Sequence, residues 1–477
     1  LPGDVARLPL NMLEILRSNI VIGPVLLSSS RIVACCRRLS ILVILSVIAV
    51  FSPLRQAAHA QGLVDAEISE MIRTYAEPLM VSAGLDPRAV RIFIVNRNEL
   101  NAFVSGGQNL FINTGLLTRA DNAGQIVGVI AHELGHIAGG HISRTNESME
   151  SAGTSSLIAG ILGVAAGLAT GRGDIGGAVA AAGQDIAIRD FLKYSRNQES
   201  SADQAGMRYL EANGLSAVGM YQLMKKLEGQ ELLPTSRQNE YVRSHPLSSD
   251  RVLSVESFLQ RSKFTDTPLP DGWELKFQRS KAKIIGFLES KSRVYRYYPE
   301  NDTSVPARYA RAIADYRRNE LDTAVPKIDA LIAEYPSDPY FWELKGQMLL
   351  EHGKIMPSVE ALRKAASLAP EAIPIRAMLA QGLVETGNPA LLGEAVENLK
   401  ALIVDDPGSA AAWRLLAISY ARLGNDGASR LASAELALLQ RDVPAAKLHA
   451  NAALKFYDKG TPSWLRAQDI LNAADLK

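Results

Sequence analysis

The sequence predicts a mainly α-helical protein, in which an α+β domain with a small β-hairpin or sheet precedes an array of helical pairs. Three observations support this fold class. The pattern His132-Glu133-x-x-His136 lies in a segment with helical periodicity, two runs of strand-forming residues flank a glycine turn at 105–108, and prolines recur about every 34 residues in the last third of the chain.

The segment 1–60 is predicted to be an N-terminal extension followed by a secretory signal. Arg31, Arg37 and Arg38 precede an apolar run over 39–51, and Ala58-His59-Ala60 places small residues where a signal peptidase cleaves. The run is shorter than the ~20 residues that a membrane-spanning helix needs, so an uncleaved anchor is the less favoured alternative. The sequence therefore predicts export, with cleavage after Ala60.

Charge and cysteine content exclude several classes of function. Lys+Arg number 51 and Asp+Glu 50, with no basic run, so a nucleic-acid partner is not expected. The two cysteines, Cys35 and Cys36, both precede the predicted cleavage site. The mature chain therefore has neither a thiolate metal site nor a disulfide framework. An exported chain without cysteine is typical of the bacterial periplasm, which is the location we predict.

Residues 61–261 form the predicted catalytic domain. Helices are expected over 65–83 and 124–138, a strand over 90–95, and a hairpin with its turn at 105–108. A polar helix is expected from 195 to 210.

The segment 152–184 between the two later helices is rich in Gly and Ala. We interpret it as a mobile cover over the active-site cleft, and a buried helix with an ordinary loop is the alternative.

The most informative motif is His132-Glu133-Leu134-Gly135-His136. On a helix, its two imidazoles lie one turn apart on the same face and can bind one zinc ion, while the glutamate beside the first can act as a base. A catalytic zinc needs a third protein ligand. The candidates are His141, His245 and the carboxylates downstream.

His141 is one residue early for the third histidine of the pattern His-Glu-x-x-His-x-x-Gly-x-x-His. One residue on a helix is a rotation of ~100°, so we predict that His141 is structural or a partner of a ligand. Glu199 and Asp203 are better candidates because they are one helical turn apart on the predicted helix. One carboxylate can bind zinc while the other orients a ligating imidazole. Without the histidine motif, this pair would indicate only a solvated acidic face.

Residues 262–305 are predicted to be a polar connector that becomes amphipathic over 273–297, and residues 306–477 form a repeat domain. Trp342 and Trp413 lie two periods apart, and Pro336, Pro370 and Pro407 follow one another at intervals of one period. This period is typical of tetratricopeptide repeats, whose stacked helix pairs form a concave binding surface. An unrelated helical bundle is the alternative.

The order of these motifs, followed by Ser244-His245-Pro246 and Arg251, resembles the HtpX/Ste-type gluzincin peptidases. With the signal and the repeats, the whole chain after residue 61 resembles their periplasmic branch, the β-barrel-assembly-enhancing proteases. The resemblance implies one Zn²⁺ per chain and a set of residue roles. These are the ligands His132, His136 and Glu199, the base Glu133, the orienting Asp203, His245 as a removable fourth ligand that keeps the enzyme latent, and Arg251 nearby.

The resemblance also implies a zinc endopeptidase that acts in the quality control and assembly of outer-membrane β-barrel proteins, with chaperone activity through its repeats. Its implied partners are unfolded or misassembled outer-membrane proteins and the β-barrel assembly machinery, and it leaves room for peripheral contact with a membrane. An extended substrate is expected to pair with the hairpin edge, and His245 and Arg251 are candidates for stabilising the oxyanion. The alternative function is a repeat-based chaperone or adaptor whose zinc site is latent or non-catalytic.

Overall fold

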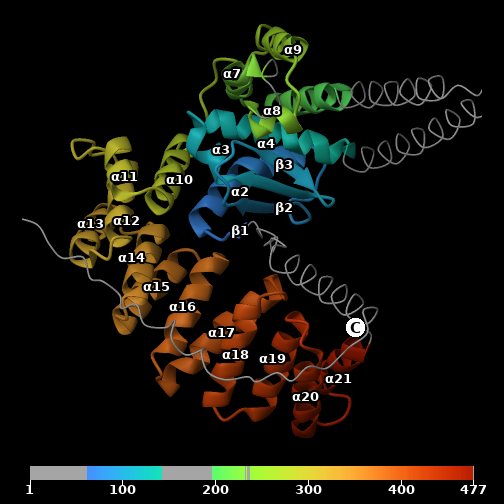
Figure 1. The fold of residues 1–477 in the computed structure, drawn as a ribbon, viewed down its shortest axis with the longest axis vertical. Helices are drawn as coiled ribbons and strands as arrows, with labels where there is room; N and C mark the ends of the chain where they lie inside the picture. The colour runs from blue at the N-terminus through green and yellow to red at the C-terminus, as the bar shows by residue number, and fades with distance from the viewer. Residues whose placement is uncertain (1–61, 142–195, 231–232, 234–236, 476–477) are drawn as a thin grey trace, which may run out of the picture. The chain divides into compact units, whose positions relative to one another are not determined.

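The computed structural model describes residues 62–141, 196–230, 233 and 237–475 (Figure 1). The predicted signal and the Gly/Ala-rich segment 152–184 lie outside the described residues. The predicted fold class, mainly α with a small sheet followed by helical repeats, is confirmed. No helix in the described ranges is both long enough and apolar enough to cross a membrane.

The first helix, α2 (Ala66–Ser82), begins where the sequence predicts it. The side chain of Asp65 caps it by accepting a hydrogen bond from the backbone N–H of Ile68 over 2.9 Å. Its apolar face, which includes Tyr75 and Leu79, is fully buried in the largest apolar core of the chain's first part. The acidic first turn, by contrast, contacts the repeats, as described below.

A four-stranded sheet packs beside this helix, with strand order β1-β2-β4-β3. Its strands are β1 (Gly62–Leu63), β2 (Arg91–Val95), β3 (Ala102–Ser105) and β4 (Asn109–Asn113). Strands β3 and β4 form the predicted hairpin, and Gly106 and Gly107 turn it with φ angles of 60° and 95°. Strand β2 pairs in parallel with β4, and β1 pairs antiparallel with β2. Strand β3 is therefore an edge of the sheet.

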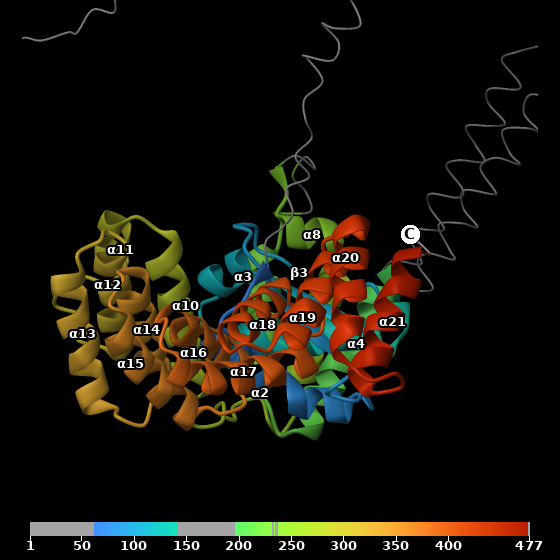
Figure 2. The same ribbon diagram turned by 90° about the horizontal axis from the view of Figure 1, so that it is seen from below.

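Two helices follow the sheet, α3 (Thr114–Arg119) and α4 (Ala123–Ala138). Helix α4 is the centre of the domain, because it contacts α2, β3 and α7 (Val218–Leu227) and is buried along almost its whole length. Residues 196–212 are also helical. Two short helices, α8 (Glu240–Ser244) and α9 (Ser249–Leu259), complete this part of the chain, and Figure 2 shows α4 and α8 from a second direction.

The predicted connector contains two helices, α10 (Trp273–Leu288) and α11 (Lys291–Tyr297). Helix α10 does more than link two domains. Its residues Trp273 and Phe277 belong to the same apolar core as α2 and α4, and the hydroxyl of Tyr75 donates to the carbonyl of Trp273 over 2.6 Å. Its opposite face packs Ala282 and Ile285 on the first repeat helix.

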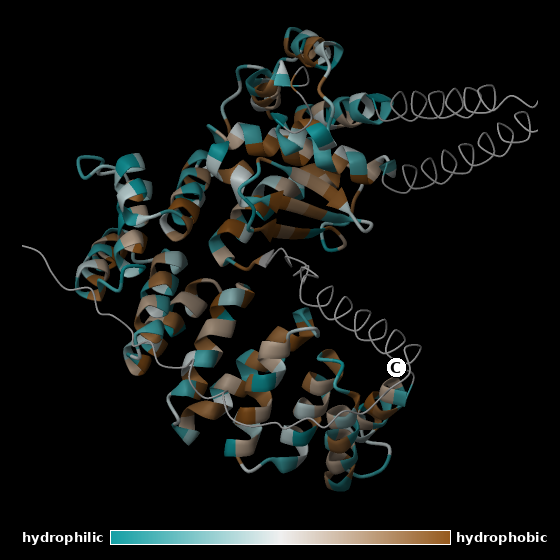
Figure 3. Ribbon diagram, viewed as in Figure 1, coloured by the Kyte–Doolittle hydropathy of each residue, from teal (hydrophilic) through white to brown (hydrophobic). Residues whose placement is uncertain are grey.

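The rest of the chain consists of helices that pack against their neighbours in sequence. They are α12 (Val305–Tyr316), α13 (Leu321–Glu334), α14 (Pro339–Glu351), α15 (Ile355–Leu368), α16 (Ile373–Glu385), α17 (Pro389–Asp405), α18 (Ala410–Arg422), α19 (Asp426–Leu439), α20 (Val443–Ala453), the 3-10 turn η3 (Leu454–Phe456) and α21 (Pro462–Asp475). The first helices of successive pairs are α12, α14, α16, α18 and α20, and their starts follow the period of about 34 residues that the sequence indicates. Figure 3 shows apolar and polar residues alternating along these helices.

Two repeats share a detail of side-chain bonding. The indole N–H of Trp342 donates to the carbonyl of Pro336 over 3.0 Å, and that of Trp413 donates to the carbonyl of Pro407 over 2.9 Å. Each tryptophan therefore fastens the first helix of its pair to the turn before it. The spacing of Trp and Pro in the sequence reflects this contact.

The first turn of α2 is joined to the repeats by a buried cluster of charges. Arg279 of α10 lies 2.7 Å from Glu67 and 2.5 Å from Asp338, and Lys283 lies 2.7 Å from Asp65. The hydroxyl of Tyr309 in α12 donates to Glu67 over 3.0 Å. Charged groups at the starts of α2 and α14 and on α10 thus neutralise one another. Their pairing specifies how these three helices align, which apolar packing alone would not do.

Candidate metal centre

The helix formed by residues 196–212 approaches α4 closely because small residues face each other. A Cβ atom on Gly135 would lie 2.7 Å from the carbonyl oxygen of Ala202, and one on Gly206 would lie 3.0 Å from the carbonyl carbon of Ala131. Backbone therefore packs on backbone at two points. This approach brings the side chains of Glu199 and Asp203 to the face of α4 that carries His132 and His136.

Four side chains converge there. One donor atom from each of His132, His136, Glu199 and His245 lies within 4.8 Å of all the others, and all four residues are buried. Nε2 of His132 lies 3.1 Å from Nε2 of His136 and 3.2 Å from Nδ1 of His245. The oxygens of Glu199 lie 3.4 Å from His132, 3.2 Å from His136 and 3.3 Å from His245.

These separations fit a tetrahedral metal ion. Bonds of about 2.0–2.1 Å from zinc to nitrogen or oxygen place neighbouring ligand atoms about 3.3–3.4 Å apart. The charges also fit, since three buried carboxylates, Glu133, Glu199 and Asp203, face one permanent cation, Arg251. Within the part of the chain that the structure describes, both oxygens of Glu133 and one of Glu199 lack a hydrogen-bond partner. A divalent cation bound by the four donors would neutralise this excess.

Asp203 and Arg251 form the surroundings of His132. Oδ1 of Asp203 lies 2.8 Å from Nδ1 of His132, so Nδ1 donates when Nε2 faces the other donors. Arg251 donates to both oxygens of Asp203, over 2.6 and 2.8 Å, and to the carbonyl of Pro246 over 2.7 Å. Arg251 also lies 3.0 Å from Glu199, without the geometry of a hydrogen bond.

Electrostatics at the site favour charged carboxylates. Burial tends to raise the pKa of Glu199, but the surrounding histidines hold it well below its usual value. Burial likewise tends to raise the pKa of Asp203, yet the Arg251 guanidinium keeps it below its usual value. Burial tends to lower the pKa of His132, whereas hydrogen bonds with Asp203 and Glu199 raise it to about 10. Both carboxylates therefore favour the ionised form, in which Glu199 can bind a cation and Asp203 can accept hydrogen bonds from His132 and Arg251.

His245 reaches the site from the C-terminal end of α8. Its Nδ1 faces the other donors, while its Nε2 lies 3.2 Å from the carbonyl oxygen of Ala102 and 3.3 Å from Glu133. It thus contacts both the donor set and the edge strand β3. The ring of Tyr241 packs on its imidazole with ring centres 4.7 Å apart. Sequence reasoning missed Tyr241, although its position one helical turn before His245 was a usable signal.

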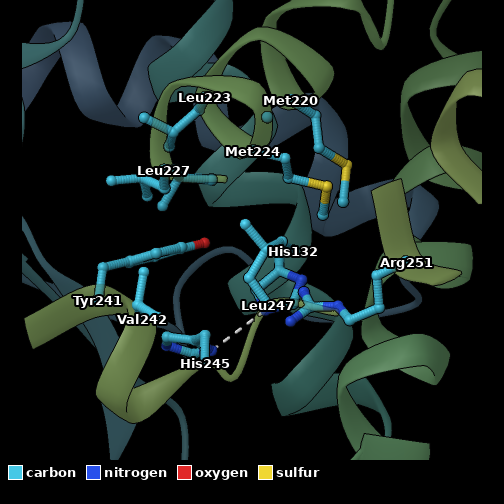
Figure 4. Close-up of a pocket in the computed structure, with 12 residues that line it drawn as sticks. His132, Met220, Leu223, Met224, Leu227, Tyr241, Val242, His245, Leu247 and Arg251 are labelled. Atoms are coloured by element: carbon cyan, nitrogen blue, oxygen red, sulfur yellow. Dashed lines mark hydrogen bonds between the residues drawn. The ribbon is translucent and has the colours of Figure 1, made fainter. Parts of the chain in front are cut away.

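A small apolar cavity of about 20 Å³ adjoins His132 and His245 (Figure 4). Side chains of α7, including Met220, Met224 and Leu227, line one side of it, and Tyr241 lies on the other. Apolar side chains therefore exclude water from this side of the donor set.

The structure thus brings together every residue that the sequence singled out for the site. His132, His136, Glu199 and His245 supply the converging donors, and Glu133, Asp203 and Arg251 surround them. His141 does not join the donors. Its Nδ1 lies 3.0 Å from Nδ1 of His136, on the side of that ring away from the site, as expected for a partner of a ligand.

Comparison with known proteins agrees with this geometry. Residues 64–258 match peptidase family M48. The β-barrel assembly-enhancing protease of Yersinia pestis is 23% identical over 378 residues, which cover 77% of this chain and 75% of that protein. That of Escherichia coli (strain K12) is 23% identical over 392 residues, which cover 80% and 78%.

A shorter relative, the metalloprotease YcaL of Escherichia coli (strain K12), is 29% identical over 172 residues, which cover 35% of this chain and 61% of that protein. The whole buried donor set, which α4, the helix at 196–212 and the end of α8 supply, lies within residues 64–258, the part of this chain that is similar to the M48 peptidases.

Proposed function

We propose that this protein is a periplasmic zinc-dependent endopeptidase that acts in the quality control of outer-membrane β-barrel proteins. The observation that carries the proposal is the convergence of four buried donor atoms within 4.8 Å of one another. In our proposal His132, His136 and Glu199 are the permanent ligands of one Zn²⁺. When bound, zinc supplies a Lewis acid that polarises a carbonyl group and lowers the pKa of a water molecule.

Glu133 is the proposed general base. It follows the first ligand on α4, its carboxylate is fully buried, and neither oxygen accepts a hydrogen bond from any residue that the structure describes. A carboxylate in this state can take a proton from the attacking water and pass it to the leaving amine. Asp203 and Arg251 act as positioning residues, because the guanidinium of Arg251 is already bonded to Asp203 and Pro246. That bonding favours positioning over oxyanion stabilisation for Arg251.

His245 is the proposed removable ligand. With three histidines and one carboxylate as donors, no position is left for substrate, whereas catalytic zinc sites keep one position open. Its Nε2 also lies within hydrogen-bonding distance of the carbonyl of Ala102 on the edge strand. An extended substrate that pairs with β3 needs such acceptors. Movement of His245 would therefore free the fourth position and one backbone acceptor together.

The substrate class rests on the relatives. Those that match most of this chain are named β-barrel assembly-enhancing proteases, and we transfer that role here. Unfolded or misassembled outer-membrane proteins are the proposed substrates, and the β-barrel assembly machinery is the proposed partner. The helix pairs from α12 onward supply a surface for binding them.

Glu133→Gln tests the proposal against the chaperone or adaptor alternative. We expect the purified variant to retain one zinc by elemental analysis, and to lose hydrolysis of an unfolded outer-membrane protein. His245→Ala should bind zinc less tightly and cleave faster. If Glu133→Gln restores outer-membrane assembly to cells that lack the protein as fully as the parent chain does, hydrolysis is dispensable and the alternative is correct.

A further inference from the structure

Two cavities that share lining residues adjoin each other beside the end of α3, and we call them together the groove. The larger, about 770 Å³, lies between α3 and the helices α10 and α11. The smaller, about 300 Å³, lies between the loop at 98–100 and the start of α8. Asn98 and Arg119 line both cavities and are hydrogen-bonded to each other, so the two cavities adjoin at this pair. The larger cavity has the size typical of ligand sites.

The smaller cavity leads toward the metal centre. Leu100 on one wall comes just before the edge strand β3, which begins at Ala102. Asn239 and Glu240 on the other wall begin α8, the helix that ends beside His245. A polypeptide lying in the groove would therefore run on toward the edge where we expect substrate to pair.

One wall of the groove is held firmly in place. A Cβ atom on Gly115 would lie 2.2 Å from the carbonyl oxygen of Asn98, so the loop packs directly on α3. Thr114 donates to the carbonyl of Arg97 over 3.0 Å, and Asn113 donates to that of Glu99 over 3.3 Å. A preformed wall lowers the entropy cost of binding an extended ligand.

The larger cavity favours carboxylates. Arg119 donates to the amide oxygen of Asn98 over 3.2 Å, and Lys281 donates to the carbonyl of Ala120 over 2.7 Å. Within the described residues, neither cation forms an ion pair with a carboxylate. Arg293, which also lines the cavity, is paired with Glu289 at 2.9 Å. Arg119 and Lys281 therefore both bond to neutral partners, although the carboxylates of Asp121 and Glu274 also act on Lys281. Arg119 is the cation more available to an anionic ligand.

The far end of the groove adds apolar contact area. Leu288 and Tyr297, which line it, are 45% and 58% exposed. Tyrosine is enriched where proteins bind one another, because its ring gives contact area and its hydroxyl bonds to polar groups. A groove with cations, amides and an exposed tyrosine suits a polypeptide better than a small inorganic anion.

We propose that this groove binds an acidic, extended stretch of the polypeptide substrate and directs the neighbouring residues to β3. The proposal rests on the proposed peptidase function, because it assigns a substrate class to that site. Arg119 and Lys281 would bind the carboxylates. Asn98 lies where the larger cavity adjoins the smaller one, on the side of the edge strand.

The test compares two fluorescent synthetic peptides that are identical except that the glutamates of one are glutamines in the other. Each peptide has one half that contains the glutamates or glutamines and one uncharged half. In one pair of peptides the glutamate or glutamine half comes first, and in a second pair it comes last. Binding is measured by anisotropy with full-length chains that carry Glu133→Gln, which prevents cleavage. The groove variant carries Arg119→Gln and Lys281→Gln, its conservative counterpart carries Arg119→Lys, and the control carries the same kind of charge removal at exposed Arg88.

We expect the groove variant to bind the acidic peptide about tenfold more weakly, with a smaller difference at high salt, and to bind the neutral peptide unchanged. Arg119→Lys and Arg88→Gln should bind as the parent does, and melting curves should show that all variants fold. Equal binding of acidic and neutral peptides, an unchanged Kd in the groove variant, or no binding of the acidic peptide overturns the proposal.

The two proposals fail separately. Zinc content and cleavage are measured on the parent chain without Glu133→Gln. A chain without zinc or cleavage that still binds the acidic peptide through Arg119 refutes only the peptidase function. A chain that cleaves, but binds both peptides alike, refutes only the groove.

Discussion

The carboxylate of Asp203 lies 2.8 Å from Nδ1 of His132 and is itself held by two hydrogen bonds from Arg251. Such a partner fixes the tautomer and orientation of a metal-binding imidazole. We therefore expect Asp203→Asn to weaken zinc binding by about 10- to 100-fold. Competition with a coloured chelator measures this affinity. Asp250→Asn, an exposed neighbour of Arg251 on α9, is the control, and equal affinity in the two variants would contradict the assigned role.

The contact between Gly135 and Ala202 predicts a strong effect of one methyl group. Because the new Cβ of Gly135→Ala would meet backbone at 2.7 Å, the two helices must separate. We expect a loss of about 1–3 kcal/mol in the free energy of unfolding, together with weaker zinc binding because Glu199 moves. Gly393→Ala on α17 is the matched control, since a Cβ there meets nothing within 4 Å. It should stabilise the chain by up to about 1 kcal/mol. Denaturant unfolding measures these free energies. A change of the same size and sign in both variants would refute this account.

Because of the charge cluster at the start of α2, we expect the loss of stability on replacing a lysine of α10 to depend on which lysine is replaced. Lys283 is 3% exposed and lies near Asp65, Glu67 and Glu343. Lys283→Met removes the ion-pair partner that Asp65 and Glu343 have within the described residues, whereas Glu67 keeps Arg279. The substitution should therefore lower the free energy of unfolding by about 3–5 kcal/mol. Lys276→Met removes a half-exposed pair with Glu70, and should cost less than about 1 kcal/mol. Similar losses in the two variants would show that the cluster is not a stabilising contact.

Glu343 predicts how stability depends on pH. Burial raises its pKa from 4.5 to about 7; Lys283 opposes this shift, and Asp65 and Glu67 add to it. Because the folded pKa is above the unfolded one, the folded chain binds the proton more tightly between these values. Proton binding by Glu343 therefore contributes to the stability of the folded chain. This contribution is complete below about pH 4.5 and is lost as pH rises through about 7. Glu343→Gln should match the parent in acid and be more stable at pH 8, by up to roughly 3 kcal/mol. Chemical unfolding of both chains across this pH range measures the difference. Equal free energies of unfolding at every pH would contradict the raised pKa of Glu343.

The elements that the sequence predicted well are those set by neighbouring residues. The start of α2, the glycine turn at 106 and 107, and the regular spacing of Trp and Pro each depend on contacts within a few residues or within one helix pair. The parallel pairing of β2 with β4 and the short strand β1 depend on distant segments instead. Helix α10 was predicted as part of a connector because its pattern shows one amphipathic helix, and no local signal says that two cores share it.

The same distinction applies to the metal centre. His132 and His136 share a face of one helix, so their spacing alone predicts that they act together. Glu199 could be chosen from its pattern with Asp203, but only the packing of two helices determines that it reaches the histidines. The contact of His245 with Ala102 joins residues 143 positions apart. No periodicity encodes such a contact, whereas the packing of Tyr241 on His245 is local and could have been found from their spacing of one helical turn.

The bond between His245 and the carbonyl of Ala102 has a consequence for the size of the ligand. If His245 is the removable ligand that we propose, its own chain tethers it to the site, and it would compete at a high effective concentration with any peptide that diffuses in. A short peptide that offers only its backbone would have to displace this internal competitor at a large concentration disadvantage. A long chain that is anchored at a second point escapes the disadvantage, because its own displacing step is also intramolecular. The molecule would then select for length before it selects for sequence.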